Sequence, residues 1–243
     1  NVAVERLGRD VDGPMLVQLA SAVKRALDEK HLLVYSQREA SQALLTEMGW
    51  DGTLLHSGGD YIMVVDTNMG FNKVNAVIKQ DLAYALDLRD LDRPQATLTV
   101  RHRHPLDLDD ITCQHTPRYG ATYEDMIARC YWDYLRAYVP AGSRLVNATP
   151  HVVSGQALLS GRDSLAHVTI GLPERGYSSF ETLLLVRPSE IMETTLSYEL
   201  PPEVLDVHRG RVSYVLLVQK QPGTQAIPVH IEIQLPSGLA FEY

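Results

Sequence analysis

The chain has 243 residues, of which 45% are apolar and 21% are charged, as is typical of a soluble globular protein with one large domain or two smaller ones. Its net charge of -8, with Lys and Arg scattered along the chain, excludes the dense cationic surface that nucleic acids require, so we expect no nucleic-acid partner. The sequence contains no apolar run near the roughly 20 residues that span a bilayer, and residues 1–13 lack the pattern of a signal peptide.

The first fifty residues predict a small α-β-α part. Apolar residues recur at helical spacing over residues 13–30, which predicts a helix. Residues 31–36, HLLVYS, predict a short buried strand. Ser36 and Glu39 form the S-x-x-E pattern of a capping box, so we expect a second helix to begin there and to end at Gly49.

After Gly58 the apolar period changes from 3.6 residues to two. Residues 82–88 and 96–101 each alternate between apolar and polar side chains, and a short polar turn joins them. This arrangement predicts a β-hairpin with one buried face. A short helix is expected over residues 123–130, with Thr122 as its N-terminal cap.

Beyond residue 150 the sequence is rich in short strand-like segments, each closed by Pro or Gly. Because no helical pattern separates these segments, they predict an antiparallel immunoglobulin-like β-sandwich. The predicted fold is therefore α+β and mainly β. Residues 1–150 are expected to form a small α/β part with the β-hairpin, and residues 151–243 are expected to form the sandwich.

Residues 59–75, GDYIMVVDTNMGFNKVN, are the first candidate binding site, because a strand-like run ends there in a cluster of polar residues. The ligand-binding candidates are Asp66, Asn68, Asn72 and Lys73. Asp-x-Asn resembles the start of a calcium loop, but Phe71 and Val77 stand where that loop needs glycine and glutamate. The alternative, which we favour, is a turn in which Asn and Gly supply positive φ angles.

His102 and His104 are the second candidate site. They are two positions apart, so on a strand both face the same side, as metal ligands do. The alternative is that the inner face of the hairpin ends in two partly buried imidazoles, and on this interpretation no metal or cofactor is expected. The sequence contains no G-x-S-x-G, H-E-x-x-H, G-x-G-x-x-G or C-x-x-C motif, so no catalytic residue is assigned.

Cys113 and Cys130 are the only cysteines of the chain, and Pro117 and Gly120 lie between them. Their spacing leaves two alternatives open. They can be two buried free thiols, or they can form a disulfide that closes a loop and stabilises the fold by about 3 kcal/mol.

Four segments together resemble the later part of a bacterial envelope domain-of-unknown-function family, number four thousand and twelve. They are HLLVYSQREASQALLTEMGWDG, GDYIMVVDTNMGFNKVN, YWDYLRAYVPAGSRLV and YVLLVQKQPGT. The resemblance implies a membrane-anchored protein whose bulk lies outside the membrane, with an anchor and an earlier half upstream of this chain. Oxidising surroundings favour a disulfide between Cys113 and Cys130. The family supplies no catalytic residue.

From these observations we expect a non-catalytic module at the extracellular face of a bacterial membrane, used for spacing, adhesion or ligand binding. Its partner would be an envelope polysaccharide or protein, and its contact with the membrane would be through the upstream anchor alone. The alternative is part of a cell-envelope glycopolymer-handling enzyme whose catalytic half lies upstream. In that enzyme Asp66 would hold a cation and Lys73 would face a phosphate.

Overall fold

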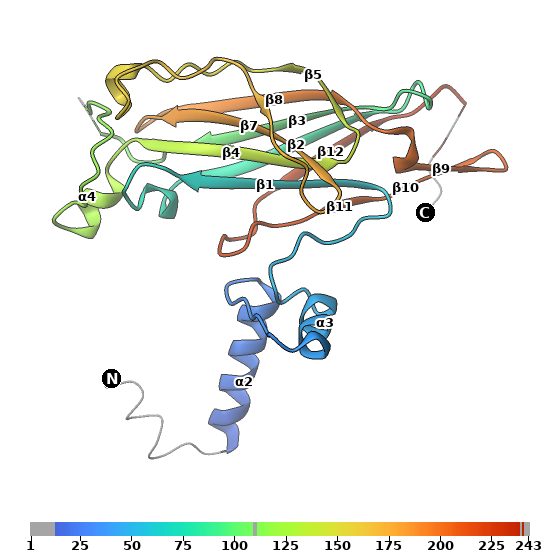
Figure 1. Cartoon of the computed structure of the whole chain (residues 1–243), viewed down its shortest axis with the longest axis horizontal. Coiled ribbons are helices and arrows are strands. Elements are labelled where there is room, and N and C mark those ends of the chain that lie inside the picture. Colours follow the sequence, from blue (N-terminus) through green and yellow to red (C-terminus); the bar gives the residue numbers. More distant parts are fainter. Residues whose placement is uncertain (1–12, 109–110, 239, 241–243) are drawn as a thin grey trace. The chain divides into compact units, whose positions relative to one another are not determined.

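The computed structural model describes residues 13–108, 111–238 and 240 (Figure 1). The chain divides into two compact units. The N-terminal unit consists of Asn1–His56 with Lys220–Gln225, and the sandwich unit consists of Ser57–Gln219 with Ala226–Tyr243. The described helices include none that is both long enough and apolar enough to cross a membrane.

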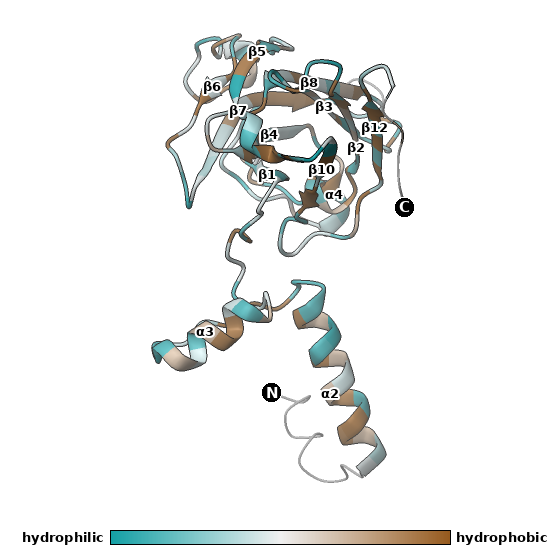
Figure 2. Cartoon of the chain, turned by 90° about the vertical axis from the view of Figure 1, so that its right-hand side faces the viewer, coloured by the Kyte–Doolittle hydropathy of each residue, from teal (hydrophilic) through white to brown (hydrophobic). Residues whose placement is uncertain are grey.

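The N-terminal unit contains two helices, α2 (Gly13–Asp28) and α3 (Glu39–Glu47). The first confirms the predicted helix, and Figure 2 shows hydrophobic residues along it. The predicted strand at residues 31–36 is wrong: this segment is irregular, and Tyr35 is 79% exposed. A strand needs a neighbour for its backbone groups, whereas here the backbone bond to Trp50 comes from Val34 alone among the described residues of the segment.

The capping box predicted at Ser36 and Glu39 is also wrong. Helix α3 begins at Glu39 itself, and its N-cap is Arg38, whose side chain makes no capping bond. The Ser36 hydroxyl instead accepts a hydrogen bond from the Arg38 backbone N–H, two residues along, in a local turn. The predicted end of the helix is confirmed, since Gly49 follows it with a φ of 69°.

The sandwich unit is built from two five-stranded sheets. Sheet 1 has the order β11-β1-β4-β7-β6 and sheet 2 has the order β12-β2-β3-β8-β5. The strands of sheet 1 are β11 (Leu216–Val218), β1 (Asp60–Asn68), β4 (Tyr131–Pro140), β7 (Tyr177–Val186) and β6 (Thr169–Ile170). Those of sheet 2 are β12 (Val229–Gln234), β2 (Lys79–Asp87), β3 (Gln95–Arg103), β8 (Ile191–Glu199) and β5 (Arg144–Ala148).

Smaller elements complete the unit. They are a two-stranded ribbon of β9 (Leu205–His208) and β10 (Arg211–Tyr214), the helix α4 (Tyr123–Ile127), and the 3-10 turns η1 (Val74–Ala76), η2 (Gly155–Ala157) and η3 (Pro202–Val204). The Thr122 side chain accepts a hydrogen bond from the Asp125 N–H, which confirms the predicted cap of α4. The helix ends three residues earlier than predicted, at Ile127.

The core lies between the facing surfaces of the two sheets. Alternate residues of each strand point into it, so Leu82, Tyr84 and Leu86 of β2 are buried while their neighbours are partly exposed. Figure 2 shows hydrophobic residues recurring along strands of both sheets. Strands β2 and β3 pair antiparallel from Lys79 with Arg103 to Asp87 with Gln95, as the predicted hairpin requires.

The predicted mainly-β fold with an antiparallel sandwich is confirmed, although the edge strands β11 and β12 pair parallel to β1 and β2. The boundary expected between residues 1–150 and 151–243 does not separate two compact units. Strand β4 pairs with β7 and strand β5 pairs with β8, so each sheet crosses residue 150. The immunoglobulin-like topology stays a prediction.

Candidate functional site

The turn after β1 engages both candidate asparagines in its own hydrogen bonds. Asn68 Nδ2 donates to Asn72 Oδ1 at 2.9 Å, and Asn68 Oδ1 accepts from the Gly70 N–H at 2.8 Å. Asn72 Nδ2 donates to the Cys130 carbonyl at 3.0 Å, which ties the turn to the start of β4. A positive φ was expected at Asn or Gly, but in this turn it occurs at Phe71, whose φ is 53°. The Phe71 ring packs against the His115 ring.

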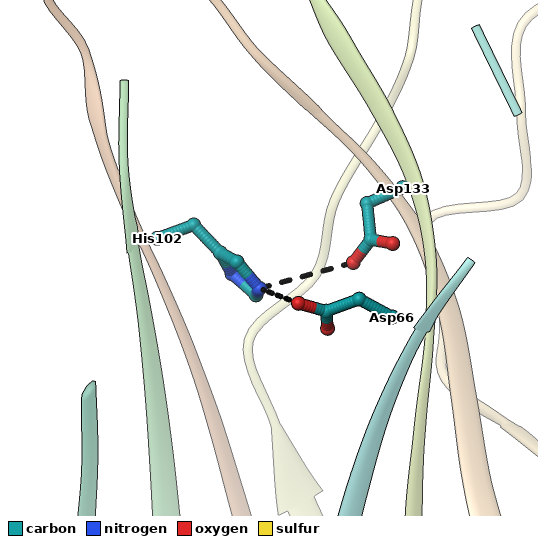
Figure 3. Close-up of side chains that lie close together, drawn as sticks. All are labelled: Asp66, His102 and Asp133. Atoms are coloured by element: carbon teal, nitrogen blue, oxygen red, sulfur yellow. Dashed lines mark hydrogen bonds and ion pairs between the residues drawn. The ribbon is translucent and has the colours of Figure 1, made fainter. Parts of the chain in front are cut away.

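Lys73 and Asp66 do not come together. Lys73 is exposed on the turn, and its backbone N–H donates to the Met126 carbonyl. Asp66 lies on β1 with its side chain directed toward His102, between the sheets (Figure 3). The four residues predicted as one ligand site therefore divide into a structured turn, an exposed lysine and an inward-facing carboxylate.

A pair of substitutions tests this division. Asn72→Ala removes bonds to the Cys130 carbonyl and to the Val74 N–H, which leaves buried polar groups without partners. We expect a loss of about 1–3 kcal/mol in the free energy of unfolding. Lys73→Ala, one position along, is expected to change stability by less than about 0.5 kcal/mol. Chemical denaturation of both variants measures the difference, and equal effects would contradict a structural role for Asn72.

Asp66, His102 and Asp133 form the one cluster of metal-ligand type found among the described residues (Figure 3). The side chains come from β1, β3 and β4, so sheet 1 supplies both carboxylates and sheet 2 supplies the imidazole. His102 Nε2 lies 3.0 Å from Asp66 Oδ2 and 3.9 Å from Asp133 Oδ2. One ligand atom from each residue lies within 4.8 Å of the others.

The two-residue period of the strands places this cluster inside the sandwich. Each of its residues continues the inward face of its strand, two positions from a buried apolar residue. Those apolar neighbours are Val64, Val100 and Leu135. The side chains of His102 and Asp133 are 0% exposed, and that of Asp66 is 17% exposed. Gln80 faces the same cluster from β2, because it pairs directly with His102 in the hairpin.

Burial governs the electrostatics of the cluster. The pKa of Asp133 is raised well above its usual range, first by burial and then by the negative charge of Asp66. The Tyr131 hydroxyl donates to Asp133 Oδ1 at 3.2 Å, and the pKa of Tyr131 is raised by its burial and by both carboxylates. Nearby, the pKa of His151 is lowered, first by burial and then by His102.

His102 and His104, expected from the sequence to form one site, have different partners in the structure. His104 is buried just beyond β3, where its Nε2 lies 2.8 Å from the Arg129 carbonyl oxygen. Its pKa is lowered by burial, an effect that the Arg129 contact opposes. The partners of His102 are Asp66 and Asp133 instead. Asp133 was missed, although its place in the inward alternation of Tyr131 and Leu135 is a signal that could have found it.

Cys113 and Cys130 form a disulfide, which confirms the predicted pairing. The bridge lies in a small apolar cluster with Trp132, Val153 and Ala157. It joins the irregular segment after β3 to the residue before β4. It therefore restrains the chain close to the buried Asp133.

A second buried carboxylate, Asp60, lies at the start of β1. It accepts hydrogen bonds from the Tyr61 backbone N–H at 2.7 Å, from the Tyr214 hydroxyl at 2.5 Å and from the Tyr84 hydroxyl. These bonds favour the ionised form, yet burial is the larger effect and raises the pKa of Asp60. Asp60 is thus a structural carboxylate wrapped by tyrosines.

An imidazole nitrogen and two carboxylate oxygens at these distances can share a proton or hold a divalent cation. Their burial restricts what else they can reach, because a general acid or base must come within hydrogen-bonding distance of its substrate. Comparisons with protein-family models, with curated proteins and with solved structures found no match to this chain.

Proposed function

We propose that this chain is a non-catalytic extracellular module of a membrane-anchored bacterial surface protein, used for spacing, adhesion or ligand binding. The observation that carries the proposal is the burial of the cluster of Asp66, His102 and Asp133, whose side chains are of the types that catalysis uses. His102 and Asp133 are 0% exposed, so a substrate placed outside the sandwich does not touch them. Such a cluster supports the structure of a module better than it supports turnover.

Two further features support an extracellular place for the module. The disulfide between Cys113 and Cys130 is of a kind that persists in oxidising surroundings. The sandwich architecture, for which we propose an immunoglobulin-like topology, is common in cell-surface domains. The partner we propose is an envelope polysaccharide or protein.

The enzyme alternative has less support from the geometry. It requires Asp66 and Lys73 to line one site, with a cation at the first and a phosphate at the second. Asp66 is directed toward the core of the sandwich, whereas Lys73 is exposed on the turn. The two groups therefore do not form a common phosphate-and-cation site.

Alkylation of thiols in intact cells tests the extracellular proposal. Intact cells that make the parent protein are quenched with acid and denatured in the presence of a maleimide, so that buried thiols also react, and the sandwich peptides are then analysed by mass spectrometry. We expect Cys113 and Cys130 to be protected until a reductant is added, because the bridge forms in an oxidising compartment. Two maleimide adducts per chain without reductant would show reduced thiols and would contradict the proposed location.

A further inference from the structure

We infer that Asp66, His102 and Asp133 form a buried binding site for a single divalent transition-metal ion, with Zn²⁺ the preferred ion. The site lies between the two sheets, where β1 and β4 supply carboxylates and β3 supplies an imidazole. This inference goes beyond the proposed function and does not depend on where the module works.

The spacing of the three side chains fits ligands of one ion. Ligand atoms at about 2.1 Å from a common ion lie about 3.0 Å apart in octahedral geometry and about 3.4 Å apart in tetrahedral geometry. His102 Nε2 lies 3.0 Å from Asp66 Oδ2 and 3.9 Å from Asp133 Oδ2. The ligand atoms of the two carboxylates lie within 4.8 Å of each other, so the Asp133 carboxylate has to move inward for all three groups to bind one ion.

His102 Nε2, Asp66 Oδ2 and the Gln80 amide lie so close together that a proton or a cation must lie between the imidazole and the carboxylate. Gln80 Nε2 lies 3.1 Å from this nitrogen and 2.8 Å from Asp66 Oδ2. If the Gln80 amide nitrogen donates to His102, the bare lone pair of the imidazole faces the lone pairs of Asp66. If the amide is turned so that its oxygen takes this place, that oxygen faces Asp66 Oδ2 instead. In either orientation two lone pairs oppose each other unless a proton or a cation lies between them.

Asp133 supplies the third ligand of the proposed ion. Its Oδ2 is buried, points toward His102 and has no hydrogen-bond partner among the described residues (Figure 3). Because the pKa of Asp133 is raised, a proton on its carboxyl can be shared with Asp66 in the metal-free chain. A divalent cation satisfies both carboxylates and the imidazole together.

The donor set selects the ion. Imidazole nitrogen suits Zn²⁺ and its first-row neighbours, whereas Ca²⁺ and Mg²⁺ prefer oxygen ligands alone. Among divalent ions that accept both donor types, Zn²⁺ binds more tightly than Mn²⁺ in the general order of affinities. The Gln80 amide oxygen, with its orientation reversed, provides a fourth ligand. A closed set of four protein ligands is typical of structural zinc sites, so the ion is expected to join sheet 1 to sheet 2.

Titration of the untagged, chelator-treated chain tests the site. Isothermal titration calorimetry with Zn²⁺, Mn²⁺ and Ca²⁺ is expected to give one Zn²⁺ per chain, weaker Mn²⁺ binding and no Ca²⁺ binding. Thermal unfolding is expected to show a higher midpoint in excess Zn²⁺, because an ion that binds the native state stabilises it. Absence of stoichiometric Zn²⁺ binding would overturn the inference.

Asp133→Asn is the decisive variant because it keeps the shape of the side chain and removes one charged ligand. We expect it to fold in the absence of metal, as checked by circular dichroism, and to lose Zn²⁺ affinity by more than about 100-fold, beyond the range for changes outside the ligand shell. Asp60→Asn, at the other buried carboxylate, is the matched control and is expected to keep the Zn²⁺ response of the midpoint.

Two outcomes of the variants would contradict the site. A full Zn²⁺ response in Asp133→Asn would place the ion elsewhere, and loss of the response in Asp60→Asn as well would show a general effect of altered stability. If Asp133→Asn does not fold, His102→Gln replaces it under the same criteria. None of these results changes the thiol alkylation pattern, so failure of this inference is separate from failure of the proposed function.

Discussion

Leu98→Ala is expected to lower the free energy of unfolding of the sandwich unit by about 3–5 kcal/mol. Leu98 lies at the middle of β3, the central strand of sheet 2, and is 0% exposed. Its strand neighbours are Tyr84 and Leu196, both buried in the same core. Truncation therefore opens a cavity that rigid strands on both sides do not fill, and the lost contacts add to the lost burial.

The measurement must report on the sandwich unit alone. The chain contains two tryptophans, Trp50 in the N-terminal unit and the buried Trp132 in β4. In a Trp50→Phe background, fluorescence during chemical denaturation follows Trp132. The matched control is Leu172→Ala, at a residue that is 89% exposed, for which a change below about 0.5 kcal/mol is expected. Similar losses for both variants would contradict the packing of the two sheets against each other.

The second large effect is a dependence on pH that arises from Asp60. Burial raises the pKa of this carboxyl above the ordinary value of 3.8, so the folded chain holds a proton that the unfolded chain has released. Stability then falls as the pH rises from that ordinary value to the raised one, with a slope that approaches about 1.4 kcal/mol per pH unit. The other titratable groups that face Asp60 are Tyr84, Tyr198 and Tyr214, which stay neutral because burial raises the pKa of each.

Asp60→Asn isolates this contribution. We expect the stability of the variant relative to the natural chain to increase between pH 4 and pH 7, because about half of the unfolded carboxyls are already ionised near pH 4. Denaturation midpoints over this range measure the difference. Asp87→Asn is the control with the opposite sign, because hydrogen bonds from Arg89 lower the pKa of Asp87 on the surface. A difference for Asp60→Asn that does not change with pH would show that Asp60 ionises as freely in the folded chain as in the unfolded one.

The parts of the fold that the sequence predicted are those fixed by neighbours along the chain. Helix α2, the hairpin of β2 and β3 and the Thr122 cap depend on contacts within one element or between adjacent strands, which periodicity and capping patterns report directly. The segment at residues 31–36 has the same apolar character as a buried strand. The segment forms no strand because the described N-terminal unit offers no neighbouring strand to pair with it. The amino-acid composition of a segment does not show whether such a neighbour exists.

The sequence did not predict the division of the chain into its two units, or the cluster of Asp66, His102 and Asp133, for a related reason. Pairing of β4 with β7 and of β5 with β8 joins segments that are far apart in the sequence, so no local pattern shows that the sheets cross residue 150. The regular alternation of β3 points to His102, but the sequence shows its neighbour two residues along the strand and not its partners across the sandwich. The polar turn beside Asp66 marks it as a candidate, but its inward direction depends on how the two sheets face each other, which the sequence does not show.

The two parallel edge strands impose an order on how this molecule is made. Asp60 pairs with Leu216 in one sheet and Leu82 pairs with Val229 in the other. The first two strands of the sandwich, β1 and β2, can therefore complete their pairing only after β11 and β12 have been synthesised. During synthesis, β1 and β2 leave the ribosome with one edge unpaired and keep it so until residues 216–218 and 229–234 have emerged. Such long-range closure slows folding and leaves the nascent chain open to wrong pairings with its neighbours.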